Sequence, residues 1–107
     1  MRVPTPPALT PEARAAALEK AARVRRERAE IKRRLKNGSL SLESAFALVP
    51  TNEAVAKMKV LAMLEALPAL GKVKARRVLE QVGIAESRRV QGLGANQRAE
   101  LLKITAR

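Results

Sequence analysis

The sequence predicts an all-α protein in which one long N-terminal helix precedes a compact helical domain. Residues 12–36 contain neither proline nor glycine, so nothing interrupts a helix there. Later segments space their apolar residues by three and four positions, which is the period of an amphipathic helix. No segment shows the sustained alternation of apolar and polar residues that marks a half-buried strand. Together these observations favour an all-helical fold.

The chain divides into three predicted parts. With 107 residues it is most simply one domain with a single modest core. We predict an extended arm over residues 1–9, a long basic helix over residues 10–38 and a compact domain over residues 39–107. The arm contains the run Val3-Pro4-Thr5-Pro6-Pro7, which is too rich in proline for a helix or a central strand. A solvated tail and a segment lying in a DNA groove are both compatible with this composition.

The long helix has clear start and stop signals. Thr10 is a good N-cap, Pro11 fits the first helical position, and Gly38 suits the residue after the C-terminus. An apolar stripe, interrupted by Arg28, is thin in the first half and stronger in the second, so the C-terminal half should dock while the N-terminal half projects or packs weakly. The members of the stripe are Ala17, Ala21, Val24, Ile31 and Leu35.

The basic residues of this helix leave two interpretations open. Ten lie between Arg14 and Lys36 against four acids in the whole helix, so a nucleic-acid backbone contact and a solvated charged surface are about equally favoured. If the surface binds nucleic acid, Arg25, Arg26 and Arg33 are candidate secondary contacts, with Lys57 and Lys59 from further along the chain.

The compact domain is predicted to contain five further helices. Ser41 caps the first, which runs to about Leu48 before Pro50, and Thr51 or Asn52 caps the second. Residues 60–67 are apolar almost all round and belong in the centre of the core. The remaining helices are predicted over residues 71–82, with Gly83 just past its end, and 95–104, separated by two turns in residues 84–94. We expect the last helix to bury Ala99, Leu101 and Leu102.

Composition excludes several classes of function. The chain has 22 Lys and Arg against 10 acids, a formal net charge of +12, which favours a polyanionic partner. It contains no Cys, His or Asp, so the usual zinc sites and Ser/His or Cys/His catalysis are excluded. We therefore expect neither an enzyme nor a metal or other cofactor. The only aromatic residue, Phe46, also argues against stacking of single-stranded bases.

The sequence gives no indication of a membrane protein. The N-terminus lacks the features of a secretory signal, and no apolar run is long enough to span a bilayer. We expect a soluble intracellular protein. Binding of the long helix to a membrane surface is disfavoured, because its stripe is dominated by alanine.

Two glycine turns are the candidate binding elements. Leu70-Gly71-Lys72 and Gly92-Leu93-Gly94 each precede a predicted helix, where backbone N–H groups suit an anion, and Arg88 and Arg89 lie between them. This arrangement suggests a clamp on a phosphate backbone. The alternatives are that Pro68 and Gly71 only punctuate core helices, and that the second turn is an ordinary surface loop. The candidate DNA-binding residues are Pro68, Leu70, Gly71, Lys72, Val73, Lys74, Arg88, Arg89, Gln91, Gly92, Leu93, Gly94 and Arg98.

Within this scheme the side chains have different expected roles. Amides near the two turns hold phosphates, and Lys72, Lys74 and Arg98 add charge. Arg88 and Arg89 enter or line the minor groove. Pro68 either ends a helix, the commoner role, or presses on a base step.

Several concatenated motifs resemble those of the actinobacterial integration host factors. The resemblance covers nearly the whole chain, and it departs at Gln91, where family members often carry a basic residue. The matching runs are Ala15 to Ala21 in the long helix, Lys57-Met58-Lys59-Val60, Leu64-Glu65-Ala66-Leu67-Pro68, Gly71-Lys72-Val73-Lys74-Ala75, and Arg88-Arg89-Val90-Gln91-Gly92-Leu93-Gly94 with Gln97-Arg98.

The resemblance implies a nucleoid-associated protein of the cytoplasm with a helix-two-turns-helix module. It implies binding of double-stranded DNA with little sequence specificity, bending or looping of the DNA, and support of phage site-specific recombination. We expect a monomer in isolation. A structured-RNA-binding or ribosome-associated protein remains the alternative, because contacts to a phosphate backbone carry no base code.

Overall fold

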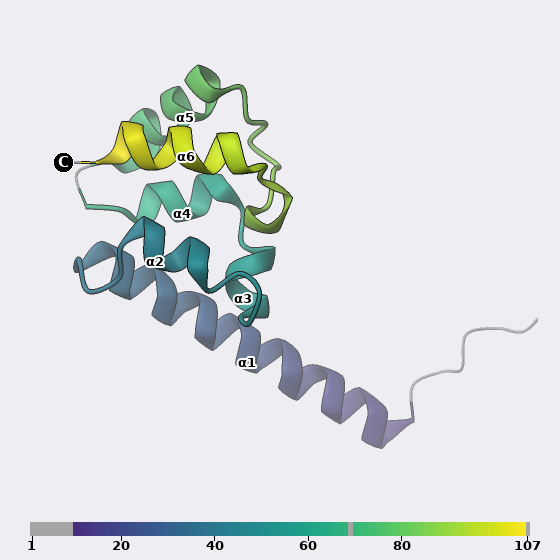
Figure 1. The fold of residues 1–107 in the computed structure, drawn as a ribbon. Coiled ribbons are helices and arrows are strands. Elements are labelled where there is room, and N and C mark those ends of the chain that lie inside the picture. The colour runs from purple at the N-terminus through teal and green to yellow at the C-terminus, as the bar shows by residue number, and fades with distance from the viewer. Residues whose placement is uncertain (1–9, 69, 107) are drawn as a thin grey trace, which may run out of the picture.

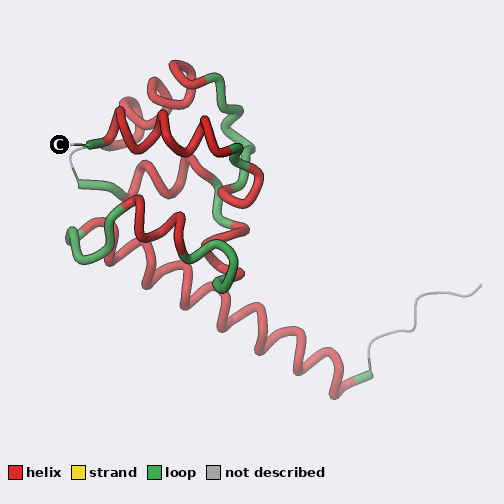
Figure 2. The backbone as a smooth tube through the Cα atoms, in the orientation of Figure 1, coloured by secondary structure: helices red, strands yellow, loops and turns green. Residues whose placement is uncertain are grey.

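The computed structural model describes residues 10–68 and 70–106, and these residues form helices and loops without a strand (Figures 1 and 2). This confirms the predicted fold class. The predicted arm, residues 1–9, lies outside the described residues. The elements are α1 (Pro11–Lys36), α2 (Leu42–Ala47), α3 (Glu53–Lys57), α4 (Val60–Ala66), α5 (Gly71–Val82), the 3₁₀ helix η1 (Val90–Gly92) and α6 (Ala95–Thr105).

Helix α1 projects well beyond the compact part of the molecule (Figure 1). It begins as predicted, with the Thr10 hydroxyl accepting the Ala13 amide at 3.0 Å and Pro11 in the first turn. Only Ile31 and Leu35 are buried, whereas every residue from 11 to 20 is exposed. The prediction that the C-terminal half docks and the N-terminal half projects is therefore confirmed.

Side-chain caps also set the starts of the next two helices. The Ser41 hydroxyl accepts the Ser44 amide at 3.1 Å, and the Asn52 side chain accepts the Val55 amide at 3.2 Å. Asn52, not Thr51, is thus the cap of α3. Between them the chain turns at Pro50, which cannot continue a helix.

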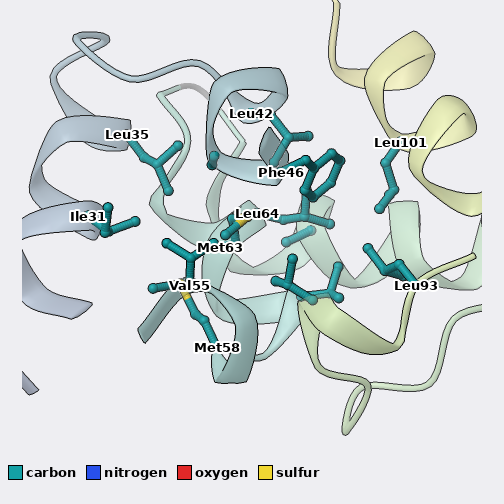
Figure 3. Packing of buried hydrophobic residues seen from close by; sticks show 14 of the residues in the cluster. Ile31, Leu35, Leu42, Phe46, Val55, Met58, Met63, Leu64, Leu93 and Leu101 are labelled. Atoms are coloured by element: carbon teal, nitrogen blue, oxygen red, sulfur yellow. The ribbon is translucent and has the colours of Figure 1, made fainter. Parts of the chain in front are cut away.

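The core lies around α4, which packs against both α1 and α5. As predicted, its side chains are buried or half-buried on all sides, and Met63 and Leu64 are fully enclosed. Side chains from α1, α2, α3 and α6 complete the cluster, including the lone aromatic Phe46 (Figure 3). The same cluster contains Ile31 and Leu35. The end of the long helix is therefore part of the core that positions everything after it.

Helices α5 and α6 form the pair on the other side of α4. Helix α5 buries Ala75, Val78 and Leu79 and ends at Gly83, whose φ of +83° is the left-handed conformation expected after a helix C-terminus. In α6 the prediction is only partly correct. Leu101 is buried and Leu102 is half-buried, but Ala99 is exposed. The face of α6 that packs on the core is therefore narrower than the apolar spacing in the sequence predicts.

Candidate nucleic-acid interface

A short antiparallel pairing joins two segments that are 30 residues apart in the sequence. The Val60 amide donates to the Arg88 carbonyl, and the Val90 amide donates to the Met58 carbonyl, each at 2.9 Å. Lys59 and Arg89 face each other between these hydrogen bonds. Met58, Val60 and Val90 are buried on the core side, so the alternation along each segment turns Lys59 and Arg89 outward.

Arg89 also contacts helix α3, which precedes Met58 in the other segment of the pairing. Its guanidinium Nη1 donates to the carbonyl of Lys57, the last residue of α3. A cation at the C-terminus of a helix satisfies a carbonyl that has no partner within the helix. Arg89 thereby fixes the end of α3 against the loop before η1. We call Lys57, Lys59, Arg88 and Arg89 the bridge cluster.

The side chain of Arg88 lies across η1. Its Nη1 donates to the Gly92 carbonyl at 3.0 Å. A Cβ atom added at Gly92 would lie 3.2 Å from the Arg88 Cδ atom, which is closer than ordinary van der Waals contact. Glycine at this position therefore leaves room for Arg88 to fold over the backbone and keep an exposed guanidinium beside the turn.

The bridge cluster concentrates positive charge that is only partly neutralised. In a pair of this type the two Cβ atoms lie about 4.5–5.5 Å apart, and like charges placed directly opposite destabilise the pairing. No ion pair within residues 10–68 and 70–106 involves Lys59, Arg88 or Arg89. An exposed group of cations without ion-pair partners is suited to an anion.

Glu53 is the carboxylate that touches this cluster. It lies 2.8 Å from Lys57 Nζ and 3.7 Å from Lys20 Nζ of α1. The hydrogen bond from Lys57, with the positive charge of Lys20 and Lys57, holds the pKa of Glu53 below its ordinary value. Glu53 thus links α1 to the end of α3 and offsets one of the four charges of the cluster.

The first glycine turn has the backbone geometry that glycine favours. Gly71 has a φ of +70°, and it opens α5 after Leu70. Lys72, Val73 and Lys74 follow on the first turn and are exposed, Val73 at 64%. The first amides of any α-helix lack an acceptor within the helix, so this turn can meet an anion. Pro68 is also exposed.

The two glycine turns lie at opposite ends of the α5 and α6 pair. Leu67, Pro68 and Leu70, around the start of α5, share a cavity wall with Leu102 to Ala106 at the end of α6. Figure 1 shows the start of α6 on the far side, next to η1. At 1.5 Å per residue the length of α6 separates the turns by about 15 Å. The turns therefore form two separate points on the surface, and the expected clamp on a phosphate backbone stays a prediction.

The sequence also predicts free amides at the second turn, but the amides of Gly92 and Gly94 are both hydrogen-bonded. The Gly92 amide donates to the Arg89 carbonyl at 2.9 Å, and the Gly94 amide donates to the Gln97 side-chain oxygen at 3.0 Å. Residues 90–92 form a 3₁₀ helix where we expected only turns, and this local helix accounts for the first of these bonds. What the second turn presents outward is the side chains of Arg88 and Gln91, both exposed.

Two other predicted site residues, Leu93 and Arg98, are buried or half-buried instead of exposed. Leu93 is 6% exposed and belongs to the core, so its side chain cannot meet a partner. Arg98 is half-buried, with its guanidinium carbon 6.0 Å from the centre of the Phe46 ring and its Nε buried without a hydrogen-bond partner among the described residues. Arg98 therefore packs on the core more than it adds surface charge.

On α1 the candidate secondary contacts are exposed. Arg25 and Arg26 make no ion pair in the part of the chain that the structure describes. Arg33 binds Glu30, with Nε 3.0 Å from Oε2, and this hydrogen bond lowers the pKa of Glu30. Helix α1 also packs on α3, and Lys20 of α1 shares Glu53 with Lys57 of the bridge cluster.

The sequence predicts Lys57 and Lys59 only as secondary contacts and does not indicate that Glu53 belongs to the site. The signal that was available is the run Met58-Lys59-Val60, apolar on both sides of a lysine. Three residues are too few for alternation to stand out, and the partner segment is remote. The pairing was therefore not predictable from spacing alone.

Comparison with known proteins agrees with this architecture. The family model described as an S13-like H2TH domain matches residues 35–104. Integration host factor of Streptomyces coelicolor is 58% identical over 95 residues, or 89% of each chain. That of Mycobacterium tuberculosis is 53% identical over 97 residues, covering 91% of this chain and 92% of the relative.

A solved structure is similar over most of the fold. The structure of sIHF bound to an 8-bp palindromic DNA superimposes with a TM-score of 0.77 at 52% sequence identity, covering 80% of this chain and 97% of the other. The structural match, the matching family model and the level of identity to curated relatives lead to one conclusion. The chain belongs to the integration host factor family of Streptomyces and mycobacteria, within the S13-like H2TH domains.

Proposed function

We propose that this protein is a nucleoid-associated architectural protein that binds double-stranded DNA with little sequence specificity. The observation that carries the proposal is the bridge cluster, where Lys59 and Arg89 face each other with no acid to neutralise them among the described residues. A phosphate beside them neutralises these charges. The DNA complex of a 52% identical protein supports duplex DNA as the polyanion.

The two arginines divide the work at this surface. Arg88 is anchored by one hydrogen bond to the Gly92 carbonyl and enters the minor groove, where the narrow groove attracts guanidinium groups. Arg89 is tied to the Lys57 carbonyl and lines the groove while holding Lys57 and Lys59 toward phosphates. Gln91 extends the same exposed edge without adding charge.

The first glycine turn supplies a second point of contact with the same duplex. The amides after Leu70 and the charges of Lys72 and Lys74 hold a phosphate, and the exposed Val73 contacts a sugar. The separation of about 15 Å between the two glycine turns spans about four to five base-pair steps. Anchoring at both ends, with Pro68 at a base step, favours a bent duplex.

Helix α1 extends this surface beyond the compact part of the molecule. Arg25, Arg26 and Arg33 meet the flank of a bent duplex or a second DNA segment, which promotes looping. Bending and looping in the cytoplasmic nucleoid would compact DNA and bring distant sites together, as site-specific recombination at phage attachment sites requires. Such a role needs no catalytic group or cofactor.

Structured RNA is the second candidate ligand. Backbone contacts alone do not distinguish two kinds of duplex, so the same turns could hold the phosphates of RNA. The two forms differ in groove shape and in the 2′-hydroxyl, so a groove-reading Arg88 should discriminate between them.

Direct competition tests the proposal. Unlabelled duplex DNA or duplex RNA of the same sequence is titrated against the protein bound to labelled duplex DNA, at one fixed salt concentration. We expect RNA to require at least about tenfold more competitor, the scale of one good groove contact. Equal or stronger competition by RNA would overturn the assignment to DNA.

A further inference from the structure

An apolar cavity opens at the end of the molecule away from the bridge cluster. It has a volume of about 580 Å³ and lies where the end of α1, the turn before α5 and the end of α6 meet. Its apolar wall is made largely by leucine and isoleucine side chains, among them Leu35, Leu40, Leu42, Leu67, Leu102 and Ile104. A concave apolar site of this size is large enough for a short peptide segment.

The one charge in the described lining of this cavity is negative. Glu43 is the only charged residue among the described residues that line it, in a chain whose formal net charge is +12. Glu43 lies in the first turn of α2, is exposed and forms no ion pair among the residues that the structure describes. The cavity therefore suits an apolar segment that carries one positive charge.

We propose that this cavity binds the N-terminal arm, residues 1–9, of a second copy of the chain. The arm has the complementary composition, with Arg2 as its only charged side chain among Met1, Val3, three prolines, Ala8 and Leu9. Proline-rich peptides of this kind bind in the polyproline II form and lose little conformational entropy on binding. The apolar residues of the arm fill the leucine-lined cavity, and Arg2 pairs with Glu43.

The arm of the same chain cannot fill the cavity. Residues 1–9 are connected to Thr10 at the start of α1, whereas Leu35 in the last turn of α1 lines the cavity. Those two points are about 37 Å apart at 1.5 Å per residue. Nine residues span at most about 30 Å when fully extended, so the arm would end before it entered the site. The contact has to form between copies.

Such a contact is head-to-tail, because the arm of one copy meets a different surface of the next. Head-to-tail contacts that do not close into a ring produce open chains of molecules. One short segment in one pocket gives weak affinity in solution, and copies held on the same duplex gain from a high effective concentration. The cavity shares Pro68 and Leu70 with the first glycine turn, but none of its lining belongs to the bridge cluster, so the contact between copies can be measured without DNA.

Cysteine cross-linking tests the contact cleanly, because the chain contains no native cysteine. Full-length Val3→Cys protein is mixed with full-length Ala106→Cys protein under a mild oxidant, with and without duplex DNA. Ala106 is exposed and lines the cavity. The matched control is Ala85→Cys, an exposed position in the loop after α5. We expect several-fold more mixed disulfide with Ala106→Cys, and equal yields would overturn the proposal.

A charge exchange tests the pairing that selects the arm. Glu43→Lys in the Ala106→Cys copy should lower the mixed disulfide about threefold, the scale of an exposed ion pair. Arg2→Glu in the Val3→Cys copy should then restore it. Failure of the exchange to restore the yield would show that the arm does not bind beside Glu43. Yields measured without DNA keep this outcome separate from any failure of DNA binding.

Discussion

At the scale of single residues, two adjacent arginines have different anchors. Arg88 bonds to Gly92 within its own turn, whereas Arg89 bonds to Lys57 across the antiparallel pairing. The sequence indicated both as binding residues, because basic pairs beside glycine turns are typical of phosphate sites. It did not separate their roles, because each anchor is a backbone carbonyl whose position depends on tertiary packing. Losing Arg89 should therefore disturb the whole bridge cluster, and losing Arg88 should remove one contact.

The two glycines of the second turn should respond differently to alanine. Gly92→Ala crowds the Arg88 side chain that bonds to the Gly92 carbonyl, because the new Cβ would lie 3.2 Å from Arg88 Cδ, whereas a Cβ at Gly94 meets only Gln97 Oε1 at 3.8 Å. We expect Gly92→Ala to weaken duplex DNA binding by about tenfold, the value of one arginine contact. Gly94→Ala should bind as wild type within about twofold. A fluorescence anisotropy titration distinguishes the two variants, and similar affinities would contradict the role given to Gly92.

At the scale of elements, α1 is a helix with two different halves. The spacing of Ile31 and Leu35 predicted which half docks, and the Thr10 cap predicted where the helix begins. Both depend on local chemistry and were read correctly. Which elements α1 meets was not predictable, because α3 and α4 come to it only after the chain has folded back.

Two leucine substitutions compare the docked half of α1 with its projecting half. Leu35→Ala removes a side chain that is 0% exposed and should cost about 2–5 kcal/mol of unfolding free energy. Leu18→Ala, at a position 63% exposed, should change it by less than about 0.5 kcal/mol. Urea denaturation followed by circular dichroism gives both values. A large loss from Leu18→Ala would mean that the projecting half is packed in solution.

The contact between α1 and α3 carries a prediction about charge. Glu53 neutralises Lys57 and Lys20, and its lowered pKa keeps it ionised. The stabilising contact is therefore present above the ordinary pKa of a glutamate and is lost as pH falls through the lowered value. Glu53→Gln releases both lysines, so it should tighten duplex DNA binding about two- to fivefold. The same variant should remove the contribution of Glu53 to the pH dependence of folding stability.

A matched control separates position from total charge. Glu80→Gln changes the net charge equally, on an exposed face of α5 where Glu80 forms no ion pair within the described residues. Its effect on affinity should be smaller than that of Glu53→Gln. If both variants tighten binding alike, Glu53 has no special relation to the bridge cluster.

At the scale of the whole molecule, the order and approximate bounds of the α-helices were predictable, whereas the short helix η1 and the mutual arrangement of the helices were not. Caps, prolines and apolar spacing act within a few residues, so Ser41, Pro50 and Gly83 marked their boundaries correctly. The pairing of residues 58–60 with 88–90 and the opposite placement of the glycine turns are set by long-range packing around α4. For the same reason Leu93 and Arg98 were assigned to the surface, although Leu93 is buried in the core and Arg98 is half-buried beside Phe46.

None of the helices in the described part of the chain is long and apolar enough to span a bilayer. The candidate DNA-binding groups lie at both ends of the α5 and α6 pair and along α1, so the excess of positive charge is spread over the molecule. Long-range attraction to DNA should therefore survive many single substitutions. A test of the site has to separate local contacts from this general attraction.

The salt dependence of duplex DNA binding separates local contacts from general electrostatic attraction most directly. The double variant Lys59→Ala/Arg88→Ala removes two bridge-cluster charges and leaves the Arg89 anchor in place, and Lys36→Ala/Lys103→Ala removes two exposed charges elsewhere. With about six phosphates engaged, the slope of log K against log salt should be about −5 for the wild type. The bridge-cluster variant should lose about two units of slope and at least about tenfold in affinity, with the control near wild type. Equal slopes and affinities for the two double variants would contradict the bridge cluster as the DNA-binding surface.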